Sequence, residues 1–388
     1  MKKVLFFIES LSRGGAEKVL SDIVCHLDKT KFDVTVCTVT DDDFYQEKVS
    51  QVCHYRSLLK TSSYRAGGIK KIIFWLMIKI IYLFPAKWVY WLFFKEKYDV
   101  EVAFIEGFST KLIASSSNKN SRKIAWVHTD MKNNPYADRC YRSQKEHEET
   151  YRSFDEIICV SQKAQEVFQN KFKSVNTVSV QYNPVDENEI QKKSAEIINV
   201  ERPKGLLLIT IGRLVEQKGY IRLLHCVAEL LKKGFSFSLW IIGDGEQKKA
   251  LEDMIKEYGL ENHVKLLGFQ SNPFQYIAKA DAFVCSSYAE GFSTAATESL
   301  LLEKPIFTVD CSGMKELFGG FSCGEIVDNS DEKLFDMLEQ LVSGRIVLDD
   351  YKPALKERAK YFKLNDRMNE IENILDGSDE NKKDTVYA

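Results

Sequence analysis

The feature that most constrains the fold is an alternation of short apolar segments with amphipathic helical segments, which runs through the chain twice. Such an alternation predicts parallel sheets with helices on both faces, and therefore an α/β fold. The ten expected strands are Val4 to Ile8, Asp33 to Thr38, Val100 to Ile105, Arg122 to Val127, Glu156 to Val160, Leu206 to Ile211, Phe237 to Ile242, Val264 to Leu267, Ala282 to Cys285 and Ile306 to Val309.

A polar stretch at about residues 183–203 separates the two runs. Asn183-Pro184 ends the first pattern and Pro203 helps to open the second, and prolines at such positions interrupt regular structure. The 388-residue chain also exceeds what one core usually holds, about 250 to 300 residues. We expect two doubly wound domains, residues 1–185 and 186–352, then one long helix over 353–376 and a mobile tail over 377–388.

Charge divides the chain in the same place. Residues 1–185 contain 28 Lys and Arg against 21 Asp and Glu, a formal charge of +7, and the remainder carries −9. A basic N-terminal half suits an anionic partner, such as lipid headgroups or a phosphorylated acceptor. Scattered, solvated lysines would give the same count, and we expect no nucleic-acid partner.

The cysteines and the N-terminus bear on the compartment. Nine cysteines is an odd number, and several lie in apolar runs, which favours a reducing cytoplasm over a disulfide framework. The apolar run at the N-terminus is shorter than the roughly 7 to 15 residues of a signal peptide, so we interpret it as a strand. No Cys or His pair has metal-ligand spacing, and we interpret Asp41-Asp42-Asp43 as a solvated loop. No metal or other cofactor is expected.

Residues 69–94 are unusually rich in apolar and aromatic side chains. Lys79, Pro85 and Lys87 interrupt the run, which argues against a membrane-spanning helix of about 20 apolar residues. Tryptophans flanked by lysines are typical of segments that lie in a membrane interface. We therefore predict that this segment contacts an anionic membrane surface and a phosphorylated acceptor at that surface. Helices packed on the N-terminal sheet are the alternative. The side chains expected at the membrane are Trp75, Phe84, Trp88 and Trp91.

Gly14 and Gly15 lie in the turn after the first strand, before a helix. Paired glycines there let the backbone approach an anionic ligand at a helix N-terminus, although a tight turn with positive φ would also require them. The G-x-G-x-x-G spacing is absent, which disfavours a dinucleotide site.

Two cations follow the first strand of the second half, Arg213 and Lys218. The carboxyl ends of parallel strands are where open α/β sheets bind ligands, so these residues could neutralise a diphosphate. Surface cations without a role are the alternative.

A further motif, residues 286–300, follows the strand Ala282 to Cys285. Glu290 lies on the loop, and Glu298 lies within a helix that Ser293 or Thr294 would cap. Carboxylates accept hydrogen bonds from sugar hydroxyls, although two glutamates eight residues apart also occur by coincidence.

Taken together, Gly212-Arg213-Leu214 with Lys218-Gly219, and Glu290-Gly291-Phe292 through Glu298, resemble family 4 of the retaining GT-B glycosyltransferases. The similarity extends over nearly the whole chain and includes Ile242-Gly243-Asp244-Gly245 and Leu267-Gly268-Phe269. The segment Cys311-Ser312-Gly313-Met314-Lys315-Glu316, together with Gly291-Phe292-Ser293, resembles bacterial capsule and surface-polysaccharide enzymes. The resemblance implies two Rossmann-like domains facing a cleft, with a terminal helix that crosses back to the N-terminal domain.

The resemblance also implies roles for individual residues. Arg213 and Lys218 would hold the donor diphosphate, Glu290 the transferred sugar and Glu298 the ribose, and His128 would meet the donor sugar. A lone histidine after a strand is otherwise more often structural. The remaining donor-binding residues expected are Gly14, Gly15, Gly243, Phe269, Gly291, Phe292, Ser293 and Thr294. The sequence departs from the family pattern in two places. Ser293 stands where many relatives have proline, which alters the helix start but removes no ligand. Cys311-Ser312-Gly313 replaces paired glycines, which puts donor-phosphate contacts at that segment in doubt.

The expected activity is therefore metal-independent transfer, with retention, from a nucleotide diphosphate sugar, with a UDP-sugar favoured. The acceptor would be a glycan or an undecaprenyl-diphosphate-linked glycan on the cytoplasmic face of the membrane. Two alternatives remain: a sugar-nucleotide epimerase or hydrolase on the same fold, and an inactive subunit that scaffolds a polysaccharide assembly.

Overall fold

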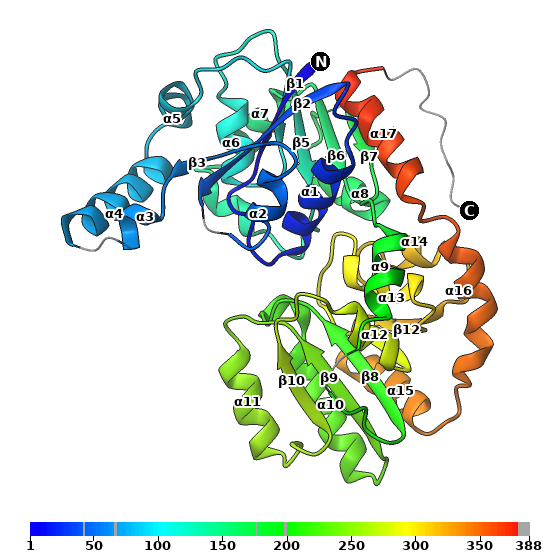
Figure 1. Cartoon of the computed structure of the whole chain (residues 1–388). Coiled ribbons are helices and arrows are strands. Elements are labelled where there is room, and N and C mark those ends of the chain that lie inside the picture. Colours follow the sequence, from blue (N-terminus) through cyan, green and yellow to red (C-terminus); the bar gives the residue numbers. More distant parts are fainter. Residues whose placement is uncertain (42, 66–67, 176, 198–199, 379–388) are drawn as a thin grey trace. The chain divides into compact units, whose positions relative to one another are not determined.

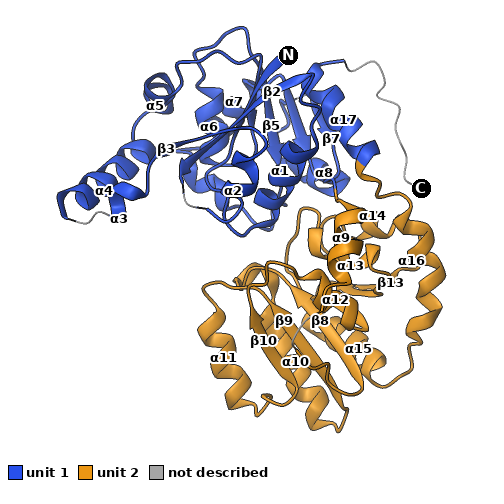
Figure 2. Ribbon diagram, in the orientation of Figure 1, with its two compact units in different colours: residues 1–184, 365–384 blue, residues 185–364, 385–388 orange. Residues whose placement is uncertain are grey.

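The structure is a computed structural model that describes residues 1–41, 43–65, 68–175, 177–197 and 200–378. It contains two compact units (Figure 2). The N-terminal unit comprises Met1–Pro184 and the C-terminal segment from Asn365, and the C-terminal unit comprises Val185–Leu364. Each unit is built around one parallel sheet with helices packed against it (Figure 1).

The sheet of the N-terminal unit has seven strands in the order β3-β2-β1-β4-β5-β6-β7, and every neighbouring pair is parallel. Its strands are β1 (Lys2–Phe7), β2 (Phe32–Thr40), β3 (His54–Leu59), β4 (Val100–Ala103), β5 (Arg122–Val127), β6 (Glu156–Cys159) and β7 (Val178–Val180). Its helices are α1 (Gly15–His26), α2 (Gln46–Ser50), α3 (Ser62–Arg65), α4 (Gly68–Leu83), α5 (Ala86–Phe93), α6 (Phe108–Ala114), η1 (Tyr136–Cys140), α7 (Gln144–Arg152), α8 (Gln162–Lys171) and α17 (Leu364–Asp376).

The sheet of the C-terminal unit has six parallel strands in the order β10-β9-β8-β11-β12-β13. Its strands are β8 (Leu206–Ile211), β9 (Phe237–Ile242), β10 (Val264–Gly268), β11 (Ala282–Cys285), β12 (Ile306–Val309) and β13 (Gly324–Val327). Its helices are α9 (Glu187–Ser194), η2 (Glu216–Lys218), α10 (Tyr220–Lys232), α11 (Lys248–Glu257), α12 (Phe274–Lys279), α13 (Thr294–Leu301), α14 (Met314–Phe318), α15 (Asp331–Val342), η3 (Leu348–Tyr351) and α16 (Lys352–Ala359).

The strand order reverses once in each sheet, between β1 and β4 and between β8 and β11. In open parallel sheets the loops that leave such a pair diverge to opposite faces, and ligands bind in the crevice at the carboxyl ends of the two strands. We call these two places the N-terminal and the C-terminal switch point. The fold therefore indicates where in each unit to look for a site.

The expected fold class, two Rossmann-like parallel-sheet domains, is confirmed. All ten expected strands are present, and three further strands, β3, β7 and β13, were missed. Each missed strand lies at an edge of its sheet, and most of its residues are only partly buried. Because an edge strand has one covered side, it lacks the apolar run that marks a central strand.

The expected single helix over 353–376 is wrong, since the structure has two helices, α16 and α17, with a break at residues 360–363. The two helices bury their apolar side chains in different units: Leu355 of α16 in the C-terminal unit, Ile371 of α17 in the N-terminal unit. Glu372 on α17 accepts hydrogen bonds from the Asp28 backbone N–H at 2.9 Å and from Lys31 Nζ at 2.8 Å. The return of the last helix to the N-terminal domain is thus confirmed. Residues 379–388 of the expected tail lie outside the described residues.

The polar stretch expected as a linker also contains regular structure, because α9 lies within it. The Asp186 carboxylate caps this helix by accepting a hydrogen bond from the Glu189 backbone N–H at 2.8 Å. Such a cap satisfies a backbone donor that the helix leaves open and contributes about 1 kcal/mol.

Candidate active site

The loops after β8 and β11 meet at the C-terminal switch point. Gly219, with φ of 65°, approaches so closely that a Cβ on it would lie 2.1 Å from the Ser286 carbonyl oxygen. The Ser286 hydroxyl donates to the Lys218 carbonyl at 3.0 Å, and the Gln217 side chain donates to the Ala289 carbonyl at 2.7 Å. These contacts fix the two loops relative to each other, so that residues 72 positions apart in the chain become neighbours.

Lys218 and Glu290 are brought together by these loops. Lys218 Nζ lies 2.6 Å from Glu290 Oε1, and the side chains are 21% and 9% exposed. The Ser287 hydroxyl donates to the same Glu290 oxygen at 2.6 Å. Burial disfavours the charged form of Lys218, but the Glu290 carboxylate outweighs it and raises the Lys218 pKa. The site therefore holds a permanent cation in a fixed position.

Arg213 lies on the same loop as Lys218, five residues nearer to β8. Its side chain is exposed, and the backbone on either side of it is held in place. Gly212 N–H donates to the Ile242 carbonyl at 3.0 Å, and Leu214 N–H donates to the Asp244 carbonyl at 2.9 Å. The backbone is thus fixed, while the guanidinium extends toward solvent from a stable base.

Glu298 and the start of α13 complete the expected motif. The Ser293 hydroxyl accepts a hydrogen bond from the Ala296 N–H at 3.3 Å, so Ser293 caps the helix and Thr294 begins it. Glu298 is buried in the second turn of α13. Gly291 and Phe292 are buried on the loop before the cap, and the segment 311–313 packs against them, since a Cβ on Gly313 would lie 2.7 Å from the Gly291 carbonyl oxygen.

The loop after β9 closes the same edge of the sheet. Gly243, with φ of 148°, lies so near to Gly212 that a Cβ would come within 1.9 Å of the Gly212 carbonyl oxygen, so no larger residue fits. Its N–H donates to the Gly268 carbonyl at 2.9 Å, which places the half-buried Phe269 beside this loop. The structure therefore gathers the expected donor-binding residues of the C-terminal unit at the carboxyl ends of its strands.

Gly14 and Gly15 lie at the N-terminal switch point, after β1. Gly14 has φ of −121° and is the N-cap of α1, and Gly15 is its first residue. The alternative that these glycines are needed for positive φ is therefore wrong. A Cβ on Gly14 would instead collide with the Glu17 carboxylate, 2.0 Å away, so the glycine gives this side chain space at the helix start.

His128 follows β5 in the N-terminal unit. Its ring packs against Phe104, with ring centroids 4.8 Å apart, and burial lowers its pKa to about 3. The imidazole is neutral at physiological pH and can act as a hydrogen-bonding group, not as a cation.

Glu106, which the sequence analysis missed, holds the His128 loop. One carboxylate oxygen accepts hydrogen bonds from the His128 N–H at 2.7 Å and from the Thr129 N–H at 2.8 Å, and the other accepts from the Tyr136 hydroxyl at 2.9 Å. Glu106 is completely buried, and burial raises its pKa. The sequence feature that could have revealed Glu106 as a candidate site residue was its position directly after the expected strand Val100 to Ile105.

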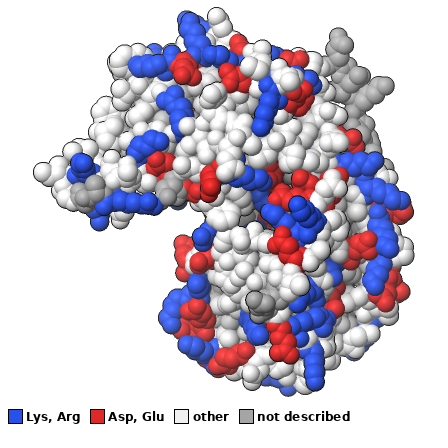
Figure 3. Space-filling model, viewed as in Figure 1, with Lys and Arg blue, Asp and Glu red and all other residues white. Residues whose placement is uncertain are grey.

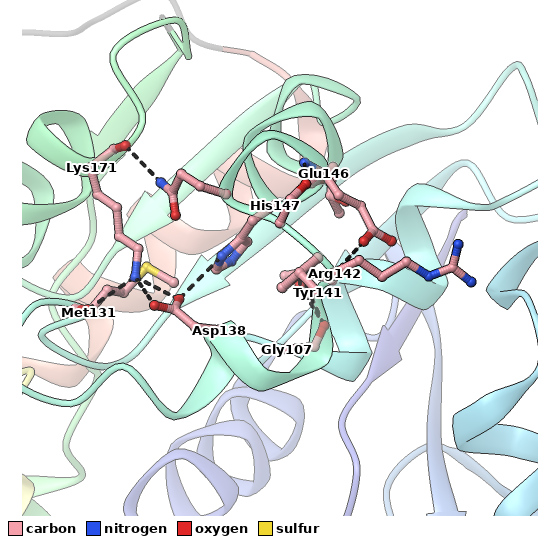
Figure 4. Close-up of polar contacts among 12 residues, drawn as sticks. Gly107, Met131, Asp138, Tyr141, Arg142, Glu146, His147 and Lys171 are labelled. Atoms are coloured by element: carbon pink, nitrogen blue, oxygen red, sulfur yellow. Dashed lines mark hydrogen bonds and ion pairs between the residues drawn. The ribbon is translucent and has the colours of Figure 1, made fainter.

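A second cluster anchors the far end of the same loop (Figure 4). The Asp138 carboxylate accepts a hydrogen bond from Lys171 Nζ at 2.6 Å and lies 3.3 Å from His147 Nδ1. The His147 ring stacks on Tyr141 at a centroid distance of 3.8 Å, and burial lowers its pKa to about 4. Both ends of the segment that carries His128 are thus fixed by polar contacts.

The segment 69–94 forms α4 and α5, and its apolar side chains divide into two sets. Phe74, Ile81 and Tyr90 are buried, whereas Trp75, Phe84, Trp88 and Trp91 are 50% to 62% exposed. Helices α3 and α4 project from the sheet of the N-terminal unit (Figure 1), and Figure 3 shows this arm as mostly uncharged surface. The alternative, helices packed on the N-terminal sheet, accounts for the buried set but not for the exposed one. Among the described residues, no helix is both long enough and apolar enough to span a bilayer.

Asp41 and Asp43 have structural partners. Asp41 accepts a hydrogen bond from the Thr61 N–H at 2.6 Å, and Asp43 accepts one from the Leu11 N–H at 2.8 Å. Asp42 lies outside the described residues. Within the described ranges, no three acidic, His or Cys side chains are placed to hold a metal ion.

Comparison with known proteins identifies the class. The family model described as Glycosyltransferase Family 4 matches residues 13–189, and the model described as Glycosyl transferases group 1 matches residues 191–361. The chain is therefore a glycosyltransferase with two Rossmann-like domains. It belongs to the GT-B enzymes that join a family 4 domain to a group 1 domain.

Two curated proteins are similar to the chain in sequence, and one solved structure is similar to it in fold. The chain is 29% identical over 377 residues to N-acetylgalactosamine-N,N'-diacetylbacillosaminyl-diphospho-undecaprenol 4-alpha-N-acetylgalactosaminyltransferase of Campylobacter jejuni. The alignment covers 93% of this chain and 96% of the Campylobacter protein. It is 27% identical over 304 residues to the lipopolysaccharide 1,6-galactosyltransferase of Salmonella typhimurium, over 74% and 79% of the two chains. The solved structure of Anabaena Alr3699/HepE with UDP and glucose has a TM-score of 0.73 at 19% identity, over 97% and 100% of the two chains.

Proposed function

We propose that the protein transfers a sugar from a nucleotide diphosphate sugar, with a UDP-sugar favoured, to a glycan or an undecaprenyl-diphosphate-linked glycan, with retention of configuration. The observation that carries the proposal is the fixed Lys218–Glu290 pair at the C-terminal switch point. A cation held at the carboxyl end of parallel strands is suited to a phosphate.

The donor contacts follow from this placement. Lys218 and Arg213 bind the diphosphate, because a compact ammonium and a planar guanidinium both donate to phosphate oxygens. Glu290 contacts the sugar and Glu298 the ribose, since carboxylates accept hydrogen bonds from hydroxyls. His128, held neutral by burial, contacts the donor sugar from the N-terminal unit.

Transfer proceeds on one face of the sugar. The bond between the anomeric carbon and the diphosphate oxygen breaks, and its electron pair stays on the diphosphate. The acceptor oxygen bonds to the same face of the carbon, and its proton passes to a donor phosphate oxygen. Lys218 and Arg213 stabilise the negative charge that develops on the leaving group, and Glu290 has already fixed the Lys218 ammonium. Because cations of the chain serve here, no metal ion is required.

The relatives support this choice of donor and acceptor. The Anabaena structure is a complex with UDP and glucose, and the name of the Campylobacter enzyme describes an acceptor attached to diphospho-undecaprenol. Surface-polysaccharide or lipopolysaccharide synthesis is the process that these relatives suggest.

The proposal also places the protein on the inner face of the cell membrane. The exposed aromatics of α4 and α5 supply apolar contact, and residues 48–95 contain no Asp or Glu. Each lysine near an anionic surface contributes about 1 kcal/mol, which salt weakens, and inserted aromatics add a part that salt does not weaken. We therefore assign this surface to membrane contact beside a lipid-linked acceptor.

A thermal-shift panel of UDP, GDP and their sugars tests the donor assignment, because a ligand of the native state raises the melting temperature. We expect UDP to raise it with excess chelator present, and Lys218→Ala to abolish the rise. A panel in which no nucleotide shifts the melting temperature would favour a scaffold subunit. A protein that binds the donor but only hydrolyses or epimerises it, with every acceptor offered, would favour the alternative enzymes.

A further inference from the structure

Glu9 lies at the N-terminal switch point, two residues after β1. One of its carboxylate oxygens accepts a hydrogen bond from the Tyr82 hydroxyl at 2.8 Å. Tyr82 belongs to the last turn of α4, the helix that carries exposed apolar side chains. A single hydrogen bond thus joins the projecting arm to the place where a ligand is expected in this sheet.

The surroundings of Glu9 come from the loops after β4 and β5. Burial raises its pKa, while the Tyr82 hydroxyl, the Arg139 guanidinium and the Phe108 backbone lower it in part. The Tyr82 ring packs on Phe108 with centroids 4.7 Å apart. The carboxyl group is therefore enclosed on several sides.

A second tyrosine and carboxyl pair in the same unit provides the contrast. The Tyr90 hydroxyl of α5 donates to Glu101 on β4, also at 2.8 Å. Tyr90 and Glu101 are 1% and 0% exposed, whereas Tyr82 is 45% exposed and Glu9 is only half-buried. Glu101 is the second residue of its strand, away from the carboxyl end. The first pair can meet a ligand, and the second is sealed inside the unit.

We propose that Glu9 binds hydroxyl groups of the acceptor glycan and that Tyr82 is a positioning residue that orients Glu9. This inference rests on the proposed function for the identity of the ligand. A carboxylate accepts hydrogen bonds from two neighbouring hydroxyls, which suits the end of a sugar chain. Because Tyr82 lies on α4, the position of this helix determines how Glu9 is oriented and therefore how tightly the acceptor binds.

The test compares Glu9→Gln and Tyr82→Phe with the matched control variants Glu101→Gln and Tyr90→Phe. The probes are short-chain prenyl-diphosphate-linked mono- and disaccharides, and their binding is measured by ligand-observed NMR without donor. For the probe that the wild type binds best, we expect Glu9→Gln to weaken binding about 10- to 100-fold and Tyr82→Phe about 3- to 10-fold. The stabilisation by UDP should be unchanged in both variants.

The controls separate binding from folding. Glu101→Gln and Tyr90→Phe should lower the melting temperature and leave probe binding within about 2-fold. Probe affinities equal to wild type in Glu9→Gln and Tyr82→Phe, or a wild type that binds none of the probes, would overturn the inference. A wild type that binds a probe but not UDP would instead contradict the proposed donor, and the Glu9 comparison would still be decided by the binding data.

Discussion

The two switch points differ in charge. At the C-terminal one, Glu290 raises the pKa of Lys218 and preserves an ammonium ion. At the N-terminal one, burial raises the pKa of the Glu9 and Glu106 carboxyl groups, and in the neighbouring loop after β5 it lowers the pKa of His128 to about 3. The first environment suits an anionic diphosphate, and the second suits neutral sugar hydroxyls. Two sheets with the same strand order around their switch points thus offer chemically different environments for a ligand.

Removal of a cation from the C-terminal switch point should have the largest effect on turnover. We expect Lys218→Ala, and likewise Arg213→Ala, to lower kcat about 10²- to 10³-fold, because one preorganised charge contact contributes roughly 2.7 to 4 kcal/mol to the transition state. Lys232→Ala removes an exposed lysine that pairs with Glu229 on α10 and serves as the control. Steady-state kinetics with a folded variant measure the effect. A kcat within 2-fold of wild type for Lys218→Ala would refute the diphosphate role.

The next largest effect concerns the exposed aromatic side chains of the segment 69–94 in the N-terminal unit. Serine at Trp75, Phe84, Trp88 and Trp91 should abolish co-sedimentation with anionic vesicles, since each fully inserted aromatic contributes roughly 1.5 to 3 kcal/mol. The folded variant should still use a short soluble acceptor. Serine at Val347 and Tyr361, exposed residues of the C-terminal unit, is the control and should change nothing. Wild type that stays in the supernatant at low salt would exclude the membrane contact.

Glu298→Ala and Glu290→Ala distinguish nucleotide binding from sugar transfer within the C-terminal unit. We expect it to weaken UDP binding about 10- to 100-fold, the loss of a hydrogen bond to a charged group, with a smaller change in kcat at saturating donor. Glu290→Ala should instead reduce transfer even when donor saturates. Calorimetric titration of UDP measures the first effect, and equal affinity in wild type and Glu298→Ala would contradict the ribose assignment.

The smallest expected effect is a pH dependence of stability from His147. Its pKa in the fold, about 4, lies below the ordinary 6.5. The unfolded chain therefore binds the proton more readily, and stability is full above pH 6.5 and falls as the pH drops toward 4. The loss by pH 5.5 should be on the order of 1 kcal/mol.

Urea unfolding of wild type and His147→Phe between pH 7 and pH 5 measures this loss. The aromatic replacement can preserve the stacking on Tyr141 and should flatten the profile. The same substitution at His54, which is 77% exposed, should leave the profile as in wild type. Identical slopes in wild type and His147→Phe would show that this histidine does not titrate as expected.

The sequence predicted the central strands and the edge of the sheet where the C-terminal site lies. Arg213, Lys218 and Glu290 follow strands whose apolar runs were plain, so their common edge could be inferred from parallel topology alone. The edge strand β13 could not be predicted from the sequence, because its residues are only partly buried and form no plain apolar run. Glu9 and Glu106 were missed because their importance depends on burial and on distant partners, which spacing does not reveal.

An assay of sugar transfer decides whether the protein is a retaining, metal-independent glycosyltransferase. Wild type is incubated with UDP-hexose and UDP-N-acetylhexosamine donors, prenyl-diphosphate-linked acceptors and excess chelator, and the product is analysed by ¹H NMR. We expect release of UDP together with a new glycosidic bond whose anomeric configuration is that of the donor. A product of inverted configuration, or transfer that needs Mg²⁺ or Mn²⁺, would contradict it.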